Sequence, residues 1–95
     1  MTASAQATVS DQLTALEKSV TAALGTYWAL AKTKCRGKTR EVVRAYRATE
    51  TLMLDFTGEV ALSRRTGHVR TATRNAAQDV IAQAHTLRRV AAQSR

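Results

Sequence analysis

Arginine side chains are the residues of this 95-residue chain whose type and spacing could support chemistry. One group recurs every three or four residues, the spacing that brings side chains to one side of a helix. It consists of Arg36, Arg40, Arg44 and Arg47. On a helical wheel these four lie within about 80° of one another. Planar guanidinium groups bind phosphate or carboxylate oxygens in pairs, so the group indicates a surface for a polyanion or, as the alternative, a solvated face.

A second arginine group lies in the last third of the chain. It consists of Arg70, Arg74, Arg88 and Arg89. Residues 36–50 carry a net charge of +3 and residues 68–95 of +4, so most of the formal charge of +8 lies on these two segments. If the two groups converge in space they would follow a nucleic-acid backbone, and if they diverge they are separate contacts or solubility charge.

The residues that usually perform catalysis are few. His68 and His85 are not at the spacing of metal ligands on one helix face, and no glycine-rich loop is present to hold a phosphate. Cys35 is the only cysteine, which excludes an intrachain disulfide, and we interpret it as an exposed thiol near a turn. We therefore expect no enzyme activity, no catalytic residue, no metal, no cofactor and no small-molecule substrate.

Four large apolar residues fall at the edge of, or outside, the expected core faces. They are Trp28, Leu54, Leu62 and Ile81. Trp28 lies at the edge of an apolar stripe, where it either closes the core or anchors an interface, since tryptophan is enriched at binding hot spots. Apolar side chains outside the core leave surface that a monomer exposes. We therefore predict a protein interface at these residues and a homo-oligomer.

The elements that position these residues are predicted to be helices. The chain has no proline, and apolar residues recur at helical spacing in three segments, roughly Ser10 to Lys34, Arg40 to Arg65 and His68 to Gln93. Gly37 and Gly67 mark the turns between them, and Thr39 is a predicted N-cap. The three stripes are Val9, Leu13, Leu16, Val20, Ala23, Tyr27 and Leu30; Val42, Tyr46, Thr49, Met53, Phe56 and Val60; and Val69, Ala72, Ala76, Val80, Ala84, Leu87 and Ala91.

The fold class that follows is all-α, with an antiparallel three-helix bundle over residues 10–95 and a flexible leader over residues 1–9. A long helical hairpin that dimerises is the alternative, if the turn at Gly67 is too weak to reverse the chain. The leader has no basic segment followed by an apolar run, and nowhere do about 18 apolar residues follow one another. We therefore expect no membrane span and a cytoplasmic protein.

The functional hypothesis is a non-enzymatic, small basic helical accessory protein that binds nucleic acid through both arginine groups by neutralising backbone phosphates. The alternative is a helical protein-protein interaction module, which either self-associates or acts as a small inhibitor or adaptor on an acidic surface of a larger protein. No zinc-finger, RNP-like or leucine-zipper pattern is present. A helix-turn-helix around Gly67 is a further alternative, although its helices would be unusually long.

Overall fold

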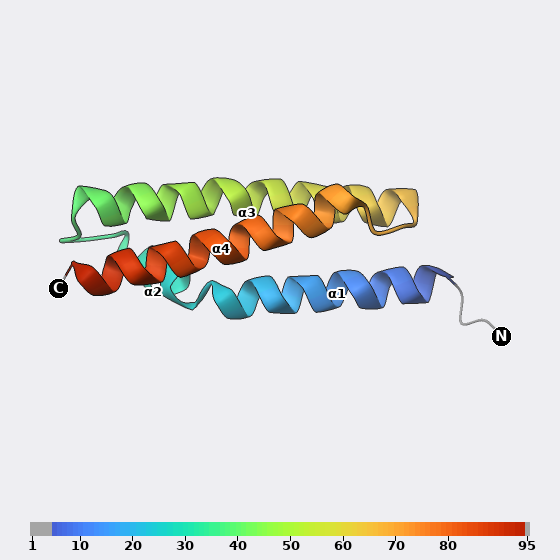
Figure 1. Ribbon diagram of the computed structural model, residues 1–95, viewed down its shortest axis with the longest axis horizontal. Coiled ribbons are helices and arrows are strands. Elements are labelled where there is room, and N and C mark those ends of the chain that lie inside the picture. The colour runs from blue at the N-terminus through green and yellow to red at the C-terminus, as the bar shows by residue number, and fades with distance from the viewer. Residues whose placement is uncertain (1–4, 95) are drawn as a thin grey trace.

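The computed structural model describes the backbone of residues 5–94 and the side chains of residues 8–94. These residues form four helices, α1 (Ala5–Ala23), α2 (Gly25–Thr33), α3 (Arg40–Thr66) and α4 (Thr71–Gln93). The molecule is elongated, about 55 × 19 × 17 Å, with α3 antiparallel to both α1 and α4 (Figure 1). The predicted all-α bundle is confirmed. Within residues 5–94 no helix combines the length and the apolar character needed to cross a lipid bilayer.

The predicted first helix differs from the structure at its start and in its middle. It was expected to begin near Ser10 after a leader of nine residues, yet α1 already begins at Ala5; residues 1–4 of that leader lie outside the described residues. The helix is also interrupted at Leu24, whose N–H donates to both Val20 O and Thr21 O, at 3.1 and 3.2 Å. This tightened turn precedes Gly25, and glycine costs about 1 kcal/mol inside a helix relative to alanine.

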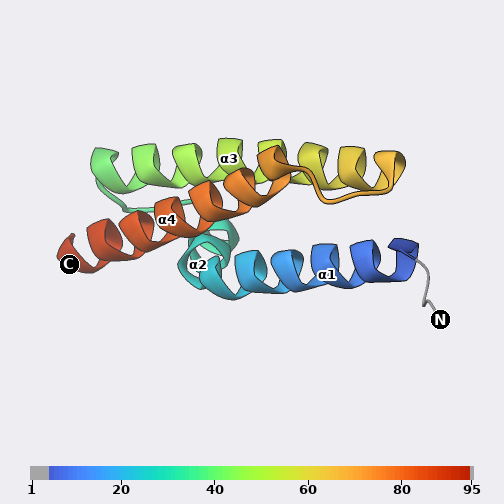
Figure 2. The ribbon, with the colours of Figure 1, turned by 45° about the vertical axis from the view of Figure 1, so that its right-hand side comes forward.

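The interruption sends α2 out of line with α1. Figures 1 and 2 show α2 lying beneath the C-terminal half of α4, rather than continuing along α1. It ends at Thr33, close to the predicted end near Lys34, because Lys34 and Cys35 both adopt left-handed conformations with φ of 53° and 55°. The N–H of Lys34 donates to Ala31 O and that of Cys35 to Leu30 O, which satisfies the last carbonyls of α2.

The two ends of α3 agree with the prediction. The Thr39 side chain accepts a hydrogen bond from the N–H of Val42, at 3.4 Å, and so caps the helix. Gly67 ends α3 with φ of 78°, and its N–H donates to Ser63 O at 3.0 Å. A left-handed φ strains residues with a Cβ, so glycine suits this position. The chain then reverses, and α4 begins at Thr71 rather than His68.

The core lies between α3, α4 and the α1–α2 pair. Leu13, Val42, Val80 and Leu87 are fully buried, as their stripes predict. The prediction for the start of α4 was wrong, because Ala72 is exposed and Ala76 only half-buried. The residues that are buried there instead are Thr73 and Ala77. The Thr73 hydroxyl can be buried because it forms hydrogen bonds with Ser63 and Glu59 of α3. The buried face at the start of α4 is therefore shifted by one residue from the predicted one.

Candidate nucleic-acid interface

The basic residues of the chain concentrate at one end of the long axis, the end that carries the C-terminus in Figure 1. This basic end comprises the last turn of α2, the turn that follows it, the first two turns of α3 and the last turns of α4. A hydrogen bond of 3.3 Å between Thr39 Oγ1 and Ser94 Oγ joins the start of α3 to the end of α4. Its cations are Lys32, Lys34, Arg36, Lys38, Arg40, Arg44, Arg47, Arg88 and Arg89.

The charge of the described chain is therefore strongly polarised along its length. The basic end holds nine cations against one carboxylate, that of Glu41. The remainder of residues 5–94 holds five cations against six carboxylates. The ion pairs found among the described residues, Arg64 with Glu17 and Arg70 with Glu59, both lie in that remainder. The nine cations of the basic end thus have no carboxylate partner within the described part of the chain.

A hollow of about 420 Å³ lies at the turn after α2. It is lined by Lys32, Thr33, Lys34 and Arg36, so its walls carry three cations and one hydroxyl group and no carboxylate. The left-handed backbone at Lys34 brings the chain around this hollow. Ammonium and guanidinium groups around a space without a carboxylate suit phosphate oxygens as ligands.

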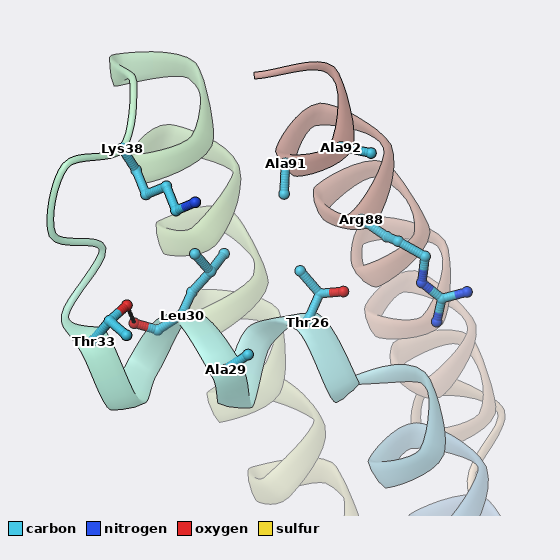
Figure 3. Close-up of a pocket in the computed structure, with 8 residues that line it drawn as sticks. All are labelled: Thr26, Ala29, Leu30, Thr33, Lys38, Arg88, Ala91 and Ala92. Carbon is cyan, nitrogen blue, oxygen red and sulfur yellow. Dashed lines mark hydrogen bonds between the residues drawn. The ribbon is translucent and has the colours of Figure 1, made fainter. Parts of the chain in front are cut away.

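A second hollow, of about 400 Å³, separates α2 from the C-terminal end of α4. Figure 3 shows the Lys38 side chain reaching from the turn toward α4, while Arg88 projects from α4 itself. Leu30 and Ala91 supply apolar wall between the two cations. The Thr33 hydroxyl donates to Leu30 O at 3.1 Å and is therefore already used within α2. The two hollows flank the same turn, so an extended anion would meet cations on both sides of it.

The structure separates the eight predicted arginines into two sets. Those it brings together at the basic end, all of them exposed, are Arg36, Arg40, Arg44, Arg47, Arg88 and Arg89. Arg70 and Arg74 lie near the opposite end. Arg70 pairs with Glu59, and Arg74 donates to Gln12 Oε1 at 2.8 Å, so both hold helices together.

The sequence reasoning missed three lysines of the basic end. Lys32, Lys34 and Lys38 alternate with other residues through the end of α2 and the turn. They fall outside the predicted arginine groups because that prediction rests on the paired hydrogen bonds of guanidinium groups, which lysine does not make. The available signal was the run of four cations at every second position from Lys32 to Lys38.

The four apolar interface candidates also divide. Trp28 is 49% exposed and Leu54 is 69% exposed. Leu62 and Ile81 are half-buried, and Ile81 packs against the core. Trp28 and Leu54 therefore remain as apolar side chains available to a partner.

The candidate catalytic side chains are dispersed. His68 and His85 are both exposed, and Cys35 is half-buried against the core rather than exposed as expected. Among residues 5–94 no group of three or more histidine, cysteine, aspartate or glutamate side chains is placed to hold a metal ion. A scan of protein-family models found no match for this chain, and neither curated proteins nor solved structures matched it.

Proposed function

We propose that this chain is a non-enzymatic accessory protein that binds the sugar-phosphate backbone of nucleic acid through its basic end. The observation that carries the proposal is the polarised charge, with nine cations against one carboxylate at one end of the molecule. Like charges that lie close together destabilise a fold. The effect is mild for each pair of residues one helical turn apart, such as Arg40 and Arg44. A polyanion would remove this repulsion, and a solvated solubility charge would gain nothing from concentration at one end.

The size of the basic end favours backbone contact over base readout. The bundle is about 19 × 17 Å in cross-section, whereas the major groove of duplex DNA is about 12 Å wide. An end of this size spans a groove and contacts the phosphates on its borders, rather than entering it. Binding by phosphate neutralisation alone is largely independent of sequence.

Matched charge reversals test the proposal. Arg44→Glu with Arg47→Glu changes two exposed residues of the basic end, and Lys18→Glu with Arg65→Glu changes two exposed residues outside it. Both double variants lower the net charge from +8 to +4. We expect the first to weaken binding to labelled oligonucleotides of any sequence, and the second to have a much smaller effect. Equal weakening by both would show that only total charge matters and would contradict the proposal.

Self-association is a second candidate function, favoured by exposed Leu54. This side chain borders a hollow of about 500 Å³ between α3 and α4, which also contains Leu52, Asp55 and Asp79. Its apolar and acidic lining is complementary to the basic end of a second copy. Light scattering over a wide concentration range should then give a mass above that of one chain, and the mass should fall as salt is added. A constant monomer mass would remove this candidate.

A further inference from the structure

Trp28 stands out because it is 49% exposed, while its neighbour Tyr27 and the next residue of the α2 core face, Leu30, are buried. The indole ring meets the Tyr27 ring edge to face, with centroids 5.1 Å apart and an interplanar angle of 79°. Tyr27 in turn stacks on Tyr46 of α3, with centroids 4.7 Å apart. The exposed indole is therefore held in place by two other aromatic rings. Because its position is already fixed, a ligand that binds it loses little free energy to ordering of the side chain.

A small hollow of about 150 Å³ lies beside this indole. Leu24, Met53 and Phe56 form apolar walls around it. Glu17 also lines the hollow, but its carboxylate is 2.9 Å from the guanidinium of Arg64. The hollow thus offers a small apolar space beside an aromatic ring, and the charge of the Glu17 carboxylate at its edge is neutralised by Arg64.

The same helix connects Trp28 to the cationic hollow at the turn. Lys32 lies four residues after Trp28, so the Cβ atoms of the two residues are about 6 Å apart on one face of α2. Lys32 also lines the hollow that contains Lys34 and Arg36. Glu50 is the nearby carboxylate on α3, and it accepts a hydrogen bond from the Tyr27 hydroxyl at 3.4 Å. A ligand that contacts both the exposed indole and the cationic hollow must combine a flat ring with an anion.

We propose that Trp28 stacks an unpaired base, so that the protein prefers single-stranded nucleic acid to duplex. This inference rests on the proposed backbone binding at the basic end. In a duplex the bases are paired and stacked inside the helix, whereas an unpaired base can turn outward onto an aromatic ring. The base would lie on Trp28 and the adjoining phosphates in the hollow of Lys32, Lys34 and Arg36.

Trp28 is the only tryptophan in the chain, so its fluorescence reports on this one position. The ligands are a single-stranded oligonucleotide, the duplex of the same sequence, and inorganic polyphosphate as an anion without bases. We expect all three to bind at low salt and only the single strand to quench the tryptophan strongly. The variants are Trp28→Ala, Trp28→Phe as the conservative change, and Leu54→Ala as a matched control on the other largely exposed apolar side chain, with circular dichroism to check folding.

Base stacking on an aromatic ring has a free energy that corresponds to about a 5- to 150-fold change in affinity. Trp28→Ala should weaken single-strand binding by this factor and leave duplex binding within about twofold, and Trp28→Phe should restore part of the loss. Unchanged single-strand affinity in Trp28→Ala, or equal quenching by polyphosphate, would overturn the inference while leaving backbone binding intact. A shift of tryptophan emission with protein concentration alone would also overturn it, because a second copy would then cover the indole. Absence of binding to all three ligands would contradict the proposed function itself.

Discussion

Two fully buried hydroxyl groups join α3 to α4, and they form a directed series of hydrogen bonds. The Arg70 N–H donates to Ser63 Oγ at 3.1 Å, and the Thr73 hydroxyl donates to Glu59 O at 3.0 Å. The two hydroxyl oxygens are 2.7 Å apart. Because Thr73 uses its proton on Glu59, Ser63 must donate to Thr73. The substitutions Ser63→Ala and Thr73→Val break this series at different points, so their effects on stability should differ.

Ser63→Ala removes the acceptor of the Arg70 N–H and leaves that group without a partner. An unsatisfied donor costs about 1–3 kcal/mol, and the partial burial of Arg70 places the cost near the lower half of that range. Thr73→Val preserves volume and leaves the Ser63 hydroxyl free to donate to Glu59 O, one helical turn earlier on α3. We therefore expect Thr73→Val to cost about 0.5–1 kcal/mol, less than Ser63→Ala.

Denaturant unfolding followed by far-ultraviolet circular dichroism measures both costs and that of the double variant. In the Ser63→Ala background no hydroxyl can replace Thr73 as the donor to Glu59 O, so Thr73→Val should cost at least as much there as in the wild type. A Ser63→Ala protein within about 0.5 kcal/mol of the wild type, or a larger loss for Thr73→Val than for Ser63→Ala, would refute this reasoning.

Three further predictions concern the core, a helix cap and alkaline pH. Phe56→Ala, at a buried position, should cost about 3–5 kcal/mol in denaturant unfolding, and a loss below about 1 kcal/mol would show that Phe56 is not in the core. Thr39→Ala should cost about 1 kcal/mol through the lost cap of α3, whereas Thr39→Ser should cost little. Burial, with Tyr46 and Glu50 nearby, raises the pKa of Tyr27 in the folded protein. The contribution of Tyr27 to the free energy of unfolding is thus complete below about pH 10 and declines as the pH rises further. Tyr27→Phe should flatten that decline when unfolding is measured as a function of pH. An unchanged decline would show that Tyr27 is not its cause.

The helical architecture could be predicted because apolar spacing, capping residues and glycine stops agree along the chain. Thr39 and Gly67 bound α3 as expected, since their effects are local to one turn of backbone. The break at Leu24 could not be predicted from apolar spacing, because Val20, Leu24 and Tyr27 also fit one continuous helix. The signal for it in the sequence is Gly25, which follows the break and is costly inside a helix.

The buried face at the start of α4 was mispredicted for a related reason. Thr73 is polar, so a search for apolar stripes passes over it in favour of Ala72 and Ala76. It is buried because Ser63 and the Glu59 carbonyl, on a different helix, satisfy its hydroxyl. Burial of a polar group depends on partners that only the tertiary structure identifies.

The sequence identifies the arginines of the candidate site, but it does not predict which of them come together in space. Arg44 and Arg88 come together because α3 and α4, of 27 and 23 residues, run antiparallel, so the start of one meets the end of the other. By the same geometry Arg74 is carried to the opposite end, where it bonds to Gln12. Which arginines converge is therefore a property of helix length and direction, not of spacing along one helix.

The most direct test of the central claim is the salt dependence of nucleic-acid binding. If about five of the cations at the basic end contact duplex phosphates, the logarithm of the association constant should fall with the logarithm of salt concentration with a slope of about −4.5. Affinity would then decrease about 500-fold between about 50 and 200 mM salt. Arg44→Glu with Arg47→Glu should reduce the magnitude of the slope by about 1.8. No binding of duplex or single strands at about 50 mM salt, or a slope that this double variant leaves unchanged, would contradict binding through the basic end.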